Sequence, residues 1–276
     1  MGKLKNLRCV IQMKIDVIMC TKNSESILQE CLNSIFEEIS ICHLIVLDGF
    51  STDKTLDIIN SYRDKFHIKI IQTNAALGKS REIGIKNVDT EWFAFIDSDV
   101  TLRNGWFWEI SNYISDNEVG AVESNFIHHY PADIPKFPPF NNVVNQRRVD
   151  KRGYTIATMI KTKIVEDISI PHDLIIYEDE FIKKWVEKKE YDWIKVVSPV
   201  VDHYPNPNHF RDAYLTGIYS IRYKLFPASS IIFSSLISPF KLFYFLYKYK
   251  SIEYTLNSLK YSFIMLKGLL DEILTL

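Results

Sequence analysis

The chain has 276 residues, of which 47% are hydrophobic and 24% charged, and its formal net charge is -1. This length is typical of one large domain, or of one domain with an appendage, and the apolar fraction can build a sizeable core. A near-neutral charge argues against general nucleic-acid binding, so we expect no nucleic-acid partner. The first residues lack the apolar segment of a secretory signal, and the four cysteines are too widely spaced for a zinc knuckle. We therefore expect a cytoplasmic protein with buried thiols.

The first hundred residues alternate between short apolar runs and segments with helical spacing of apolar residues. Because parallel strands need crossover helices, this alternation predicts a doubly wound, mostly parallel α/β sheet with helices on both faces. Ser51 or Thr52 is predicted to cap the second helix. The expected strands are 15–19, 44–47, 68–72 and 92–96, and the expected helices are 28–39, 55–62 and 79–88.

Asp97, Ser98 and Asp99 directly follow the fourth strand, and Asp48 follows the second. Carboxyl ends of parallel strands meet at one edge of a sheet, where open α/β folds bind ligands. Two carboxylates one residue apart repel each other unless a cation or hydrogen-bond donors compensate their charge. Mg²⁺ takes carboxylate and phosphate oxygens, so the pair indicates a metal-diphosphate site. The alternative is structural: an Asx-turn at Asp97 and a helix cap at Asp99.

The alternation of apolar strands and helical segments becomes less regular after residue 124. Prolines at 131, 135, 138 and 139 predict a loop, and a basic cluster follows at Arg147, Arg148, Lys151 and Arg152. Such a cluster is either a solvated face or a phosphate contact. Further on, an acidic group at 177–181 is predicted to open a helix, and 194–197 reads as a strand.

Over residues 14–213 the chain resembles the family-2 glycosyltransferases, which have the GT-A fold. The resemblance rests on motifs in order: 17–23 for the first strand and nucleotide loop, 46–55 for the second strand, 78–84 before the metal motif, and Asp97-Ser98-Asp99 for that motif itself. Glu178-Asp179 resembles the acidic pair that carries the catalytic base, and His203 resembles a late histidine of the metal shell.

The resemblance implies an inverting transferase that moves a sugar from a nucleotide-sugar donor to a hydroxyl acceptor, a glycan or lipid-linked precursor. It implies a divalent cation, Mg²⁺ or Mn²⁺, held by Asp97, Asp99 and His203. The base is expected at Asp179, with Glu178 as the second candidate. Residues expected to contact the nucleotide-sugar are Thr21, Lys22, Asp48, Arg81, Asp97 and Ser98.

Several of these residues could instead have a purely structural role. His203 also fits a hydrogen-bonded histidine at a strand end, and Arg81 also fits a surface charge of a helix. The acids at 178–180 are all favoured by a helix dipole. Two positions depart from the family pattern: Gly49 stands where a second acid is usual, and Lys22 stands where an aromatic is usual.

Two other functions compete with the transferase. Phe95–Thr101 also fits the nucleophile strand of haloacid-dehalogenase-type phosphatases, in which Asp97 would attack phosphorus, but that motif normally lies on the first strand. The second is a non-catalytic binder of nucleotide-sugars on the same scaffold. Intact acids at 97, 99 and 179 argue against the binder.

The C-terminal segment differs in composition from the rest. We expect an N-terminal extension at 1–13, the transferase domain at 14–213 and a helical appendage at 214–276, which carries seven basic and three acidic residues. Residues 228–247 hold one charge, Lys241, and predict an interfacial hairpin. From Ile252, apolar residues at 252, 256, 259, 263, 266, 270 and 273 predict an amphipathic helix with a narrow seam. We expect contact with the cytoplasmic face of a membrane, or packing against the domain or a second copy in a homodimer.

Overall fold

The computed structural model describes residues 13–130, 152–206 and 208–276. The chain forms two compact units, which we call the sheet unit, Met1–His129 with Val144–Tyr204, and the helical unit, Tyr130–Val143 with Pro205–Leu276. Residues 1–12 of the extension predicted at 1–13, the proline loop at 131–139 and three members of the basic cluster, Arg147, Arg148 and Lys151, lie outside the described residues. The boundary predicted at 213/214 stays a prediction, although residues 205–213 group with the helical unit.

The sheet unit is built on one eight-stranded mixed sheet, with strand order β3-β2-β1-β4-β7-β6-β8-β5. The first four strands in chain order are mutually parallel, as the alternation of strands and helices predicted. The sheet then changes character, because β7 runs antiparallel to both β4 and β6. The strands are β1 Ile15–Thr21, β2 Ile41–Asp48, β3 Ile68–Gln72, β4 Trp92–Ile96, β5 Val100–Thr101, β6 Val119–His128, β7 Ala157–Lys161 and β8 Asp192–His203.

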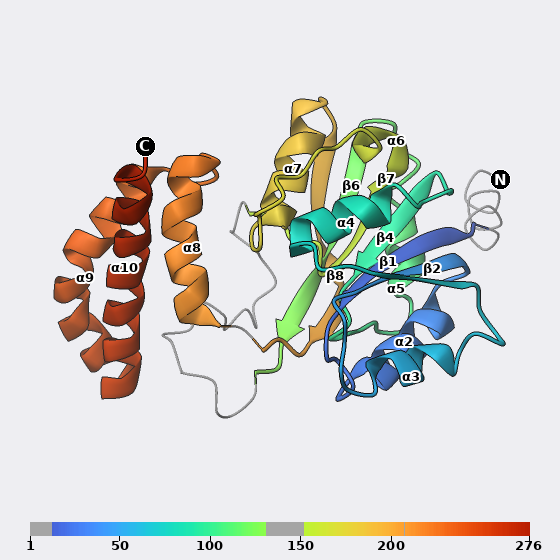
Figure 1. The fold of residues 1–276 in the computed structure, drawn as a ribbon, viewed down its shortest axis with the longest axis horizontal. Coiled ribbons are helices and arrows are strands. Elements are labelled where there is room, and N and C mark those ends of the chain that lie inside the picture. The colour runs from blue at the N-terminus through green and yellow to red at the C-terminus, as the bar shows by residue number, and fades with distance from the viewer. Residues whose placement is uncertain (1–12, 131–151, 207) are drawn as a thin grey trace. The chain divides into compact units, whose positions relative to one another are not determined.

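Helices cover both faces of this sheet, with α2 and α3 on one side and α4 and α7 on the other (Figure 1). All five residues of β4 are buried, as expected for a central strand covered on both faces. A core cluster joins β1, β2 and β4 to the apolar stripe of α2. The helices are α2 Leu28–Glu38, α3 Thr55–Asn60, α4 Leu77–Ile85, α5 Trp106–Ser111, α6 Thr162–Val165 and α7 Glu178–Lys188.

The predicted cap of the second helix is wrong. α3 starts at Thr55, and its N-cap residue, Lys54, makes no side-chain cap bond. Asp53 Oδ1 accepts from the Thr55 N–H instead. The Ser51 hydroxyl is used elsewhere, because it donates to Asp48 Oδ1 at 2.6 Å.

The helical unit contains α8 His209–Arg222, α9 Ala228–Tyr249 and α10 Ile252–Ile273. Residues 228–247, predicted as a hairpin, form part of one continuous helix, α9, with Pro239 inside it. Among the described residues, Ala228–Lys248 is the one stretch long and apolar enough to cross a membrane, by length and composition alone. α10 begins at Ile252, where the apolar seam predicted an amphipathic helix.

Candidate active site

The Asp97-Ser98-Asp99 turn directly follows β4, as the sequence predicted. The Asp97 N–H donates to the carbonyl of Ile156 at 3.0 Å, and the Val100 N–H donates back to the Asp97 carbonyl at 3.2 Å. The chain then enters the short strand β5, not a helix, so the alternative reading of Asp99 as a helix cap is wrong. The turn presents both carboxylates at the end of a buried strand.

The pairing of β5 with the end of β8 brings His203 to this turn. Val100 lies opposite His203 in the antiparallel register, and the Tyr204 N–H donates to the Asp99 carbonyl at 2.9 Å. His203 Nε2 lies 3.3 Å from Asp99 Oδ1. The ligand atoms of Asp97, Asp99 and His203 all lie within 4.8 Å of one another.

This cluster fits a divalent cation. Two carboxylates and one imidazole supply three ligand atoms, and carboxylate oxygens suit Mg²⁺ and Mn²⁺. His203 is 8% exposed, and its Nδ1 is buried with no hydrogen-bond partner among the residues that the structure describes. The other ring nitrogen, Nε2, is the one that lies next to Asp99 and is the candidate ligand atom.

Arg81 of α4 lies buried between two carboxylates from distant parts of the chain. Its Nη2 donates to Asp97 Oδ1 at 2.9 Å, and its Nε donates to Glu178 Oε1 at 3.1 Å. The guanidinium also lies over the ring of Phe95, 4.9 Å from its centroid. Arg81 is therefore no surface charge of a helix, and it joins the metal-motif turn to the start of α7.

Burial and these charges set the ionisation of the acids. Burial raises the pKa of Glu178 to about 7, although Arg81 lowers it. Burial also raises the pKa of Asp97, and Arg81 again opposes the shift. The arginine thus partly compensates two carboxylates that would otherwise be costly to bury.

The predicted acidic pair occupies the first turn of α7, with Glu180 beside it. Asp179 accepts from Arg152 Nη2, at 3.2 Å to Oδ1 and 3.0 Å to Oδ2, and its Oδ1 also accepts from the Glu180 N–H at 2.7 Å. The Arg152 guanidinium lies between two aromatic rings, 4.1 Å from the centroid of Tyr177 and 4.6 Å from that of Tyr154. Asp179, the predicted base, is therefore in direct contact with the Arg152 guanidinium.

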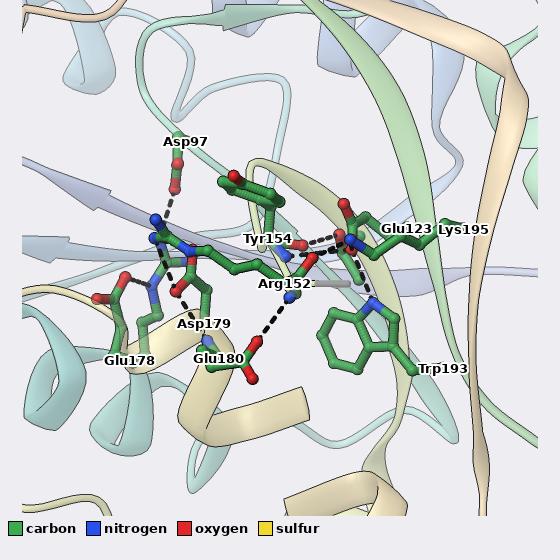
Figure 2. A network of polar contacts seen from close by, with 12 residues as sticks. Asp97, Glu123, Arg152, Tyr154, Glu178, Asp179, Glu180, Trp193 and Lys195 are labelled. Atoms are coloured by element: carbon green, nitrogen blue, oxygen red, sulfur yellow. Dashed lines mark hydrogen bonds and ion pairs between the residues drawn. The ribbon is translucent and has the colours of Figure 1, made fainter. Parts of the chain in front are cut away.

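The backbone around Arg152 is anchored on three sides, as Figure 2 shows. Glu180 Oε2 accepts from the Gly153 N–H at 2.8 Å, and Glu123 Oε2 accepts from the Tyr154 N–H at 3.1 Å. The Lys195 ammonium donates to the Arg152 carbonyl. Glu123 belongs to β6 and is almost fully buried, and Lys195 belongs to β8. These contacts therefore fix residues 152–154 to the sheet.

A chain of hydroxyl groups links the loop after β1 to the metal-motif turn. Thr21 Oγ1 donates to Ser24 Oγ at 3.0 Å, and the Ser24 and Ser98 hydroxyls lie 2.9 Å apart. Two of these residues, Thr21 and Ser98, were predicted as nucleotide-sugar contacts. Ser24 was not, since a serine after a strand carries no signal of its own.

The remaining predicted contacts lie at the ends of β1 and β2. Asp48 is opposite Thr21 in the parallel register, but its buried carboxylate already accepts from Ser51 and from Gln72 Nε2 at 2.9 Å. Lys22 is exposed, and its stem lies against Gly49, where an added Cβ would be 3.1 Å from Lys22 Cδ. Lys22 and Gly49, the two positions that depart from the family pattern, are thus in contact with each other.

Several of the predicted site residues lie close together in the structure: the metal ligands, Arg81, the acidic pair, Thr21 and Ser98. Arg152 is the member that sequence reasoning did not place, because it was read as part of a basic cluster. Its partner Asp179 is 27 residues away in sequence, and no spacing rule predicts that contact.

The profile of glycosyl transferase family 2 matches residues 16–165, more than half of the chain, so the chain belongs to this family. The fold agrees with this family assignment. The matched region contains Arg81, Asp97 and Asp99, whereas Asp179 and His203 lie beyond its end.

Among relatives, the chain is 38% identical over 163 residues to a poly(ribitol-phosphate) beta-N-acetylglucosaminyltransferase, TarS, of Staphylococcus aureus strain Mu50. That match covers 57% of this chain but 26% of TarS, so the chain spans about a quarter of that relative's length.

Two solved structures share the fold. The TarS 1–349 complex with UDP-GlcNAc superposes with a TM-score of 0.56 and 18% identity, covering 84% of this chain and 73% of the other. The Pyrobaculum calidifontis mannosyltransferase PcManGT, in complex with GDP-Man and Mn²⁺, has a TM-score of 0.61 and 13% identity, with 98% and 94% covered.

Proposed function

We propose that this chain is a metal-dependent, inverting glycosyltransferase that moves a sugar from a nucleoside-diphosphate sugar to the hydroxyl group of a glycan or lipid-linked precursor. The observation that carries the proposal is the cluster of Asp97, Asp99 and His203, whose ligand atoms lie within 4.8 Å of one another at the end of β4. It stands beside a second acidic group at the start of α7 in a chain of family 2.

On the donor side, Asp97, Asp99 and His203 would hold the cation, which when bound neutralises the negative charge that develops on the leaving diphosphate. Arg81 acts as a positioning residue, because it fixes Asp97 by a 2.9 Å bond from a buried site. The hydroxyl chain from Thr21 to Ser98 offers donors and acceptors for the nucleotide at the same edge of the sheet.

On the acceptor side, Asp179 is the general base. The acceptor oxygen forms its bond to the anomeric carbon while the bond from that carbon to the diphosphate oxygen breaks, and the hydroxyl proton passes to Asp179. A single displacement of this kind inverts the anomeric configuration. Arg152 Nη2 lies against both oxygens of Asp179 and orients the carboxylate, and because Oδ1 also accepts from the Glu180 N–H, Oδ2 is the proposed proton acceptor.

The relatives suggest where to look for substrates. TarS is named for N-acetylglucosaminyl transfer to poly(ribitol-phosphate), and a Bacillus spizizenii relative, 29% identical over 113 residues, for glucosyl transfer to the same polymer. We infer that a UDP-sugar is the first donor to try, and a polyol-phosphate chain or its lipid-linked precursor the first acceptor.

The test is a screen of UDP-, GDP- and dTDP-sugars for release of nucleoside diphosphate, with Mg²⁺ or Mn²⁺ and with or without the polymer. We expect one donor to be hydrolysed slowly alone and faster with acceptor. Asp99→Ala is the paired variant, because Asp99 is partly exposed and its loss leaves the core unchanged. Tight binding of a nucleotide-sugar without turnover under all conditions would instead favour the non-catalytic binder.

A further inference from the structure

In the helical unit, several small and polar residues are buried while many large apolar residues of α9 and α10 are exposed. The buried residues of α10 are Thr255, Ser262, Gly268, Leu269 and Glu272. The seven-residue apolar seam predicted for α10 lies outside this buried face: 252, 256, 263, 270 and 273 are exposed, and the other two members are half-buried. Ile252, for example, is 70% exposed. Packing of this seam against the sheet unit or a second copy stays a prediction.

Small residues set the spacing between α8 and α10. A Cβ added to Gly217 of α8 would lie 2.1 Å from the Met265 carbonyl oxygen, and one added to Gly268 would lie 2.1 Å from that of Tyr214. Between α9 and α10, the Ser235 hydroxyl donates to the Ser262 carbonyl at 3.0 Å. Close backbone contact through glycine and serine is how helices associate in lipid, where burying apolar side chains gives no driving force.

α9 carries the larger apolar surface. Phe233, Leu236, Phe240, Phe243 and Tyr247 follow one another at intervals of three and four residues, so they form one stripe along the helix. All five are exposed, and the last three are 76%, 75% and 85% exposed. A water-soluble helix of 22 residues would normally bury such a stripe.

Charge on the helical unit favours an anionic partner. α9 contains Lys241 and Lys248 and no acidic residue. On α10, Lys260 lies over the ring of Phe210 in α8, and Lys267 is ion-paired with Asp271 and lies over the ring of Tyr214, so the cations of α10 add less to this surface than those of α9. Over residues 214–276, seven basic residues stand against three acidic ones.

We propose that the α9 stripe, defined by the five residues above, and the exposed seam of α10 dock into the surface of a bilayer that contains anionic lipid. Aromatic side chains suit the boundary between headgroups and acyl chains, and nearby lysines add attraction to anionic headgroups. Glu253, Asp271 and Glu272 on α10 favour a helix lying in the interface over one that crosses it. This docking is independent of the proposed chemistry.

The experiment is flotation of the full chain with vesicles of phosphatidylcholine alone or with phosphatidylglycerol, at low salt. The test variant combines Phe240→Asp, Phe243→Asp and Tyr247→Asp, all at strongly exposed positions. The control variant is Trp108→Asp with Tyr113→Asp, two exposed aromatics of the sheet unit. We expect the wild-type chain and the control to float with anionic vesicles, and the test variant to float at least tenfold less.

Three outcomes would overturn the proposal. The wild-type chain could stay at the bottom of the gradient with both vesicles, or the test variant could float as well as the wild type. Light scattering could also show a wild-type dimer that the test variant abolishes, with no flotation of either, which would assign the stripe to a second copy. Circular dichroism of each variant separates a lost surface from a lost fold, and none of these readouts depends on turnover.

Discussion

Ionisation of Glu178 should make the free energy of unfolding depend on pH, and the substitution Glu178→Gln should remove that dependence. Its pKa is raised by burial from the usual 4.5 to about 7, so the folded chain binds a proton that the unfolded chain releases. The resulting contribution to stability is complete below about pH 4.5 and is lost as the pH rises through 7. With about 1.4 kcal/mol for each unit, the loss between pH 5 and 8 is about 2.5 kcal/mol.

The assay is urea denaturation of the wild-type chain and Glu178→Gln at several pH values from 5 to 8, in EDTA so that no metal contributes. Glutamine keeps the acceptor for Arg81 Nε but cannot ionise. We expect the free energy of unfolding of the wild type to fall relative to that of the variant as the pH rises, by about 2.5 kcal/mol in total. Parallel pH profiles for the two proteins would refute the raised pKa and the burial that causes it.

Two other predictions concern the acceptor side. Asp179→Asn should keep donor binding, measured by calorimetry, and lower turnover by about 10²-fold or more, because it removes basicity at constant size; normal turnover by this variant with a dead Glu178→Gln would move the base to Glu178. Arg152→Gln should lower kcat less than Asp179→Asn does and leave donor binding unchanged, since only the contact that orients Asp179 is lost; an unchanged kcat would leave Arg152 a purely structural role.

The sequence was informative where structure is local. β1 to β4 and their helices follow from apolar runs and helical spacing, and the Asp97-Ser98-Asp99 turn follows from the end of a buried run. The rest depended on contacts between distant residues. β5 is two residues long, and only its pairing with β8 brings His203 to Asp99. A strand of this length leaves no periodicity in the sequence.

Contacts between distant residues also decide whether a charged side chain is buried and which face of a helix is packed. The sequence could not tell whether Arg81 is buried, because its two partners, Asp97 and Glu178, lie 16 and 97 residues away. The 4-3 spacing in α10 correctly predicted a helix with an apolar seam. It did not reveal which face packs on α8, because close contact at Gly217 and Gly268 selects a different one.

The most direct test of the account is the rate of nucleoside diphosphate release as Mn²⁺ is added to metal-free protein, with the donor found in the screen. The account predicts almost no release in EDTA, a saturable rise with Mn²⁺ for the wild-type chain, and no rise for Asp99→Ala at an unchanged circular dichroism spectrum. Full release in excess EDTA, or by Asp99→Ala, would contradict the assignment of a metal-dependent glycosyltransferase site to Asp97, Asp99 and His203.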